Sequence, residues 1–131
     1  MEILEQELSK EEKKEILQKE VGELISELRF KDAEEMAEGA LKVGVEISFQ
    51  EALQYAFDEK FKNGDLGGAQ KIENYAVDKR MPIEIKPEIL WQAKESILKE
   101  YTYALTVDKN YAEEIEKCAA VYRIKVKDLK K

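Results

Sequence analysis

Carboxylates are the side chains of this sequence that could most readily take part in catalysis or bind a metal ion. Of its 131 residues, 29 are Asp or Glu, and none is His. Two acidic clusters stand out: Glu34, Glu35 and Glu38, and Glu113, Glu114 and Glu116. Two carboxylates brought together from different helices could serve as general acid and base, or bind a divalent cation. In a chain this acidic a solvated helix face explains the clusters better, so we predict no catalytic residue and no metal site.

Nucleophilic and phosphate-binding sites have little support either. Without histidine, neither a Ser-His-Asp nor a Cys-His system can form, nor the Glu-x-x-His box of di-iron bundles. The single cysteine, Cys118, cannot form an internal disulfide and suits a small core position on a helix. The glycine-rich segment 63–68 precedes a helix, where an anion could bind, but Asp65 would repel it and fits better as the N-cap. We therefore expect a protein that is not an enzyme and has no cofactor.

The elements that must position these side chains are helices. Between residues 48 and 79, apolar residues recur at steps of three and four on either side of the 63–68 turn, which predicts two helices folded back on each other. Ser48 and Glu51 have the spacing of a capping box. The same periodicity predicts helices at 9–30, 32–43, 87–105 and 108–126, with Trp91 off the main apolar stripe of its helix. The residues expected in the core are Leu53, Phe57, Ile72, Leu90, Ile97 and Ile115.

These elements predict an all-α fold, a single domain of five or six antiparallel helices over residues 1–131. Residues 1–8 would be a frayed lead-in, and residues 123–131 a basic tail that frays or extends. The helices could form an ordinary bundle or a short helical-hairpin array.

A weak internal repeat bears on that choice. Segments 33–40, 69–76 and 112–119 each have alanine at the first and eighth positions and an apolar residue at the fourth. Small residues at this spacing let helices pack closely. The pattern resembles the helical hairpins of tetratricopeptide-type repeats over residues 31–126, which implies stacked hairpins. The Trp and Leu-Gly of that consensus are missing at the matching positions.

Two features indicate contact with another subunit. Leu17, Val21, Leu24 and Leu28 recur at four, three and four residues, a heptad-like seam that packs either within its own domain or on a second copy. Residues 117–131 hold six bases and one acid, Asp128, although the whole chain has a net charge of -7. The candidate interface therefore joins the seam to the bases of the tail: Leu17, Val21, Leu24, Leu28, Arg123, Lys125, Lys127, Lys130 and Lys131.

The acidic charge disfavours a general nucleic-acid binder, since binding requires neutralised phosphates, and leaves only the basic tail for such contacts. No apolar run reaches the ~20 residues of a membrane span, and the N-terminus has no apolar core of a signal peptide. We expect an assembly protein that makes protein–protein contacts, mainly with itself. The alternative is a helical adaptor that binds a partner protein.

The charged fraction of 39%, the mixture of Lys and Glu, the absence of histidine and the scarcity of sulfur are features of the chain as a whole. In this character and in its length the chain resembles the small structural proteins of viruses that infect hyperthermophilic archaea, such as the Acidianus two-tailed virus. The resemblance implies a role in the virus particle, without catalysis, and a location in the virion or the cytoplasm.

Overall fold

The structure, a computed structural model, describes residues 9–130, so the expected lead-in 1–8 and Lys131 lie outside the described residues. Within that range the chain forms six α-helices, one short 3-10 helix and no strand, which confirms the predicted all-α fold. The elements are α2 (Lys10–Ser26), α3 (Phe30–Lys42), α4 (Phe49–Lys62), α5 (Leu66–Asp78), α6 (Pro87–Val107), α7 (Lys109–Val121) and the 3-10 helix η1 (Val126–Lys130).

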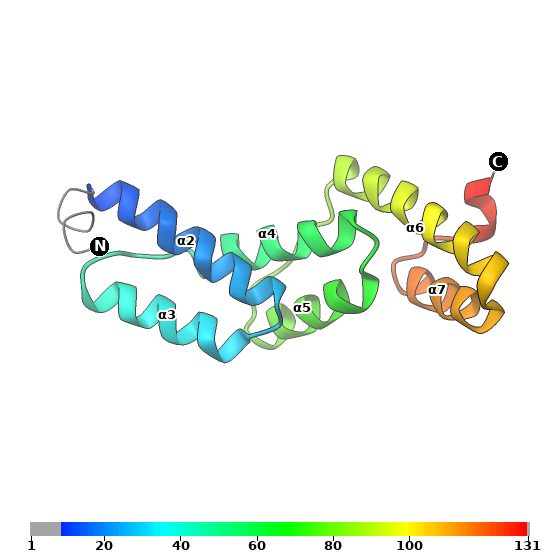
Figure 1. The fold of residues 1–131 in the computed structure, drawn as a ribbon. Coiled ribbons are helices and arrows are strands. Elements are labelled where there is room, and N and C mark those ends of the chain that lie inside the picture. Colours follow the sequence, from blue (N-terminus) through cyan, green and yellow to red (C-terminus); the bar gives the residue numbers. More distant parts are fainter. Residues whose placement is uncertain (1–8, 131) are drawn as a thin grey trace.

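The helices are arranged as three successive hairpins, α2–α3, α4–α5 and α6–α7, along an elongated molecule (Figure 1). The first helices of the hairpins pack in series, because α4 contacts α2 in one direction and α6 in the other. The 3-10 helix η1 packs on α6. The structure is thus the predicted single all-α domain, in which successive hairpins pack side by side.

The helix starts follow the sequence prediction except at α3, which begins at Phe30 rather than at Asp32. Ser9, Ser48 and Asp65 each accept a hydrogen bond from the backbone N–H three residues later, at 3.1, 3.3 and 3.0 Å. Asp108 caps α7 by accepting from the N–H groups of Asn110 and Tyr111, two and three residues later, at 3.0 and 3.4 Å. Each of these caps satisfies a backbone donor that the first turn of a helix leaves unpaired.

The helix ends depart from the prediction at two places. The helix expected over 9–30 ends at Ser26, because Leu28 adopts a left-handed conformation with φ of 65° and the Arg29 N–H bonds to Leu24 O at 2.9 Å. The helix expected over 108–126 ends at Val121, because Arg123 adopts φ of 61°. At the end of α2 the Leu28 N–H bonds to Ile25 O and the Arg29 N–H bonds to Leu24 O, and the equivalent pair of backbone hydrogen bonds ends α3, α4, α5 and α7. Leucine and arginine rarely occupy this position, so composition gives no signal for these two stops.

The three second helices of the hairpins are equivalent. The helices α3, α5 and α7 each have 13 residues, and their repeated alanines are all at most 4% exposed: Ala33 and Ala40, Ala69 and Ala76, Ala112 and Ala119. Because alanine has only a methyl group, each second helix can approach its neighbours closely along this face.

The core runs through the centre of the array. Leu53, Phe57, Ile72 and Ile97 are at most 1% exposed, as predicted. The two other residues expected in the core, Leu90 and Ile115, are only half-buried and pack against its edge. Both face outward in part because the α6–α7 hairpin is the last of the series and has no further hairpin over it among the described residues.

Candidate functional site

The seam predicted on the first helix is used inside the chain. Val21 is fully buried in the core, and Leu24 and Leu28 pack against that core. Leu17 is half-buried. This corrects the expectation that the seam is free to dock a second subunit, because α2 packs its apolar face against α3 and α4.

Polar contacts hold α2 in that position. The Gln18 side chain donates to Ser48 O at 2.7 Å and accepts from Ser48 N at 2.9 Å, so it pairs with both backbone groups at the start of α4. Gly22 faces the Tyr55 ring so closely that a β-carbon there would lie 3.1 Å from the ring. The seam therefore contributes to the fold rather than to an open surface.

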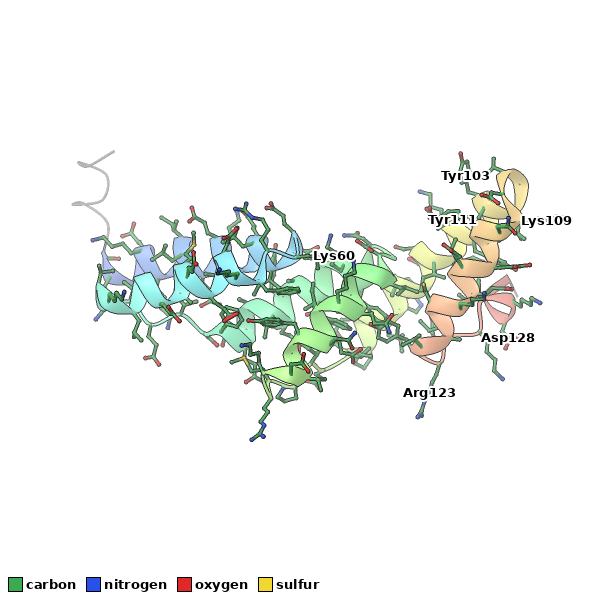
Figure 2. All side chains as sticks on the ribbon, turned by 90° about the horizontal axis from the view of Figure 1, so that it is seen from below. Lys60, Tyr103, Lys109, Tyr111, Arg123 and Asp128 are labelled. Carbon is green, nitrogen blue, oxygen red and sulfur yellow. The ribbon has the colours of Figure 1, made fainter. Side chains whose placement is uncertain are left out.

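The basic C-terminal segment is folded, which corrects the expectation of a fraying tail. Ile124 and Val126 are 4% and 3% exposed, so they anchor the segment in the core. Arg123, Lys125 and Lys127 alternate with them and are exposed, and Figure 2 shows Arg123 projecting from the end of the array. Lys130 belongs to η1, whereas Lys131 is outside the described residues. We call Arg123, Lys125 and Lys127 the basic face.

The two acidic clusters lie on different hairpins, α3 and α7. Glu34 accepts a hydrogen bond from Tyr75 and lies 3.7 Å from Lys79 Nζ, and Glu116 accepts one from Tyr101 and lies 3.8 Å from Lys127 Nζ. Within residues 9–130, no three or more Asp, Glu or Cys side chains are grouped so that they could hold a metal ion. One glutamate of each cluster, Glu34 and Glu116, thus accepts a hydrogen bond and forms an ion pair with a residue of another element.

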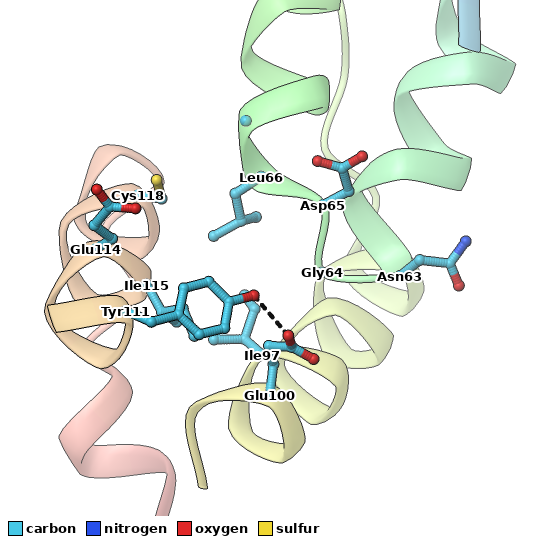
Figure 3. Close-up of a pocket in the computed structure, with 11 residues that line it drawn as sticks. Asn63, Gly64, Asp65, Leu66, Ile97, Glu100, Tyr111, Glu114, Ile115 and Cys118 are labelled. Atoms are coloured by element: carbon cyan, nitrogen blue, oxygen red, sulfur yellow. Dashed lines mark hydrogen bonds between the residues drawn. The ribbon is translucent and has the colours of Figure 1, made fainter. Parts of the chain in front are cut away.

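A cleft of about 370 Å³ opens where the α4–α5 turn meets α6 and α7 (Figure 3). Its apolar lining comes from Leu66, Ile97, Ile115 and Cys118, and its charged lining from Asp65, Glu100 and Glu114, with no basic side chain among the lining residues. The sequence singled out Asp65 and Cys118 only as a helix cap and a core filler. It gave no signal that would bring them to one cleft, because they come from different hairpins.

Tyr111 reports the electrostatic character of this cleft. Its hydroxyl donates to Glu100 Oε1 at 2.6 Å. This hydrogen bond raises the pKa of Tyr111, and desolvation and the charges of Glu100, Asp65 and Glu114 raise it further. Among residues 9–130, Asp65 is the one carboxylate of the three that forms an ion pair, since its Oδ2 lies 3.3 Å from Lys60 Nζ. The cleft therefore combines an apolar lining with a surplus of negative charge.

A second surface lies on α6, away from its buried face. Trp91, Leu98 and Leu105 are spaced by seven residues, so they lie along one side of the helix. Trp91 is 62% exposed, Leu105 is 36% exposed and Leu98 is half-buried. We call these three residues the α6 stripe. The sequence placed Trp91 off the main stripe, but it could not show that no other helix of the described chain covers it.

The chain matches no protein-family model, and neither a curated protein nor a solved structure is significantly similar to it. None of the helices in residues 9–130 is both long and apolar enough to cross a membrane.

Proposed function

We propose that this chain is a non-enzymatic assembly protein that makes protein–protein contacts through α6, first of all with other copies of itself. The observation that carries the proposal is the exposure of the α6 stripe, which is greatest at Trp91, at 62%. Tryptophan is among the residues that contribute most to binding energy at protein interfaces. Trp91 is 62% exposed, more than the exposed apolar side chains Ile16 on α2 and Tyr55 on α4, at 45% and 46%.

The position of the stripe in the array supports this role. The first helices α2, α4 and α6 pack in series, and α6 is the last of them in residues 9–130. A helix from a second molecule packed on the exposed part of the stripe would add a further helix to α6, as repeated hairpins stack on one another. Its apolar contacts would supply affinity without any change in the fold.

The finer form of this proposal is a structural role in a virus particle, as the resemblance to archaeal virion proteins implies. It rests on the length and the overall charged composition of the chain, which is typical of proteins from hot environments. In that role the protein would reside in the virion. Mass spectrometry of purified particles, compared with the cytoplasmic fraction of the infected host, would test it.

Self-association can be followed directly, because Trp91 is the chain's one tryptophan. We expect light scattering to show a mass that rises with protein concentration, together with a blue shift of the tryptophan emission as the indole is covered. The Trp91→Phe variant should associate more weakly, because the indole is lost and an aromatic ring remains, and Leu98→Glu should reduce association by about tenfold or more.

Val77→Glu is the matched control. Val77 is 65% exposed on α5, outside the α6 stripe, so the same kind of change should leave association unaltered. A chain that stays monomeric at all concentrations, with unshifted emission, would contradict self-association. That result would favour the alternative role, a helical adaptor whose α6 stripe binds a different protein.

A further inference from the structure

The cleft between the α4–α5 turn and the α6–α7 hairpin has a lining that suits a cationic side chain. Three carboxylates and no base line it, and Lys60 is the sole cation paired with any of them among the described residues. Glu114 is exposed and has no ion-pair or hydrogen-bond partner in residues 9–130. A suitable occupant would place an alkyl stem against the half-buried Ile115 and Cys118 and a positive head between the carboxylates. Arginine and lysine side chains have this form.

The chain itself carries such side chains, on the basic face at its C-terminal end. Arg123, Lys125 and Lys127 are exposed because the alternate residues, Ile124 and Val126, are buried. The segment is therefore a fixed surface rather than a loose arm. No ion pair joins this face to Asp65, Glu100 or Glu114 within residues 9–130; the one ion pair that it makes there joins Lys127 to Glu116. Its charge is thus available to a second molecule.

We infer that the basic face of one copy docks in the cleft of another, so that Arg123 and Lys125 complete a charge-paired site that a single chain leaves half-built. The inference deepens the proposed self-association and rests on it: the α6 stripe supplies apolar burial, and the cleft fixes orientation and register. Complementary charge at an interface mainly speeds encounter and selects the correct pairing. The contact is head-to-tail, because the two surfaces that meet are different.

Charge-reversal variants of the full-length chain test this. In the cleft, Glu114→Lys is compared with Glu113→Lys, which makes the same charge change on the neighbouring exposed residue outside the cleft lining. On the basic face, Lys125→Glu is compared with Lys117→Glu, an exposed lysine on α7. Sedimentation velocity measures association. It is run in about 0.02 M and about 0.5 M salt, because exposed charges are screened over ~10 Å at 0.1 M and interact over shorter distances at higher salt.

We expect Glu114→Lys and Lys125→Glu each to weaken association about tenfold at low salt, and the two controls to change it less than about twofold. A mixture of the two variants should recover association, since the native basic face of one fits the native cleft of the other and the two reversed surfaces also match. No recovery on mixing, or equal losses in Glu113→Lys and Glu114→Lys, would overturn the inference.

The proposed function can fail separately. Association that is lost in Leu98→Glu but unchanged in Glu114→Lys would leave the role of the α6 stripe intact and remove that of the cleft. A wild-type chain that is monomeric at both salt concentrations would overturn both.

Discussion

The hydroxyl of Tyr75 on α5 donates a 2.5 Å hydrogen bond to Glu34 Oε2 on α3, and so joins the second helices of two hairpins. The Tyr75 ring stacks on Phe30, with centroids 4.3 Å apart and planes at 7°. Lys79 Nζ lies 3.7 Å from Glu34 Oε1 and 5.6 Å from the Tyr75 ring centre. The hydrogen bond and the aromatic stack of Tyr75 join the first two hairpins, whereas its cation–π contact with Lys79 lies within the α5 arm.

Removing only the hydroxyl separates these contributions. In Tyr75→Phe the stack on Phe30 stays and the hydrogen bond to Glu34 is lost, so we expect the free energy of unfolding to fall by about 1 kcal/mol. Urea denaturation followed by circular dichroism measures it. Tyr103→Phe is the control, since the Tyr103 side chain is 63% exposed, and it should change stability by less than about 0.5 kcal/mol. Equal losses in the two variants would contradict a specific role for the Tyr75 hydroxyl.

The stability of the chain should depend on pH in the alkaline range. Burial, followed by the hydrogen bond to Glu34, raises the pKa of Tyr75, and burial, followed by the charge of Glu73, raises the pKa of Tyr122. In the unfolded chain a tyrosine loses its proton near pH 10. Above that pH the unfolded state binds fewer protons than the folded state, so the free energy of unfolding falls as pH rises.

The corresponding measurement is urea denaturation at several pH values from 8 to about 11. We expect a flat profile below pH ~10 and a decline above it, with a shallower decline in Tyr75→Phe. A profile that is unchanged by the substitution would show that Tyr75 keeps an ordinary pKa in the folded chain.

The core prediction concerns Ile97, which is 1% exposed on α6. Ile97→Ala removes buried methylene and methyl groups and leaves a cavity, which should cost about 2–5 kcal/mol of unfolding free energy. Val77→Ala removes exposed atoms from α5 and should cost less than about 0.5 kcal/mol. Thermal and urea unfolding of the two variants measure these losses. A loss below about 0.5 kcal/mol in Ile97→Ala, within the usual range for surface substitutions, would show that Ile97 is not buried in the folded chain.

The helix ends offer a prediction about backbone conformation. Gly44 and Arg80 occupy the same left-handed position after α3 and α5, with φ of 83° and 59°. Arg80→Gly should raise stability by up to about 1 kcal/mol because it relieves backbone strain at an exposed site. Gly44→Ala should lower it by about 1 kcal/mol for the same reason, since a β-carbon there meets no atom closer than 3.9 Å. Chemical denaturation should show changes of opposite sign in the free energy of unfolding of the two variants. Changes of the same sign would mean that the left-handed backbone conformation does not determine the effect of these substitutions.

The sequence by itself determined the elements and their starting points. Ser48 and Asp65 specify helix starts through hydrogen bonds to backbone groups only three residues away, and the spacing of Leu53, Phe57 and Ile97 specifies which face is buried. Such signals are readable because the interacting atoms are neighbours in the chain.

The tertiary structure decided which apolar and charged faces remain free. Val21 on α2 is fully buried and Trp91 on α6 is 62% exposed, because burial depends on which helix packs alongside. In the same way, Leu28 ends α2 in a conformation that its residue type disfavours, held by packing against the core. The cleft between Asp65 and Glu114 exists because two hairpins meet there, and contacts between residues so far apart leave no periodic trace in the sequence.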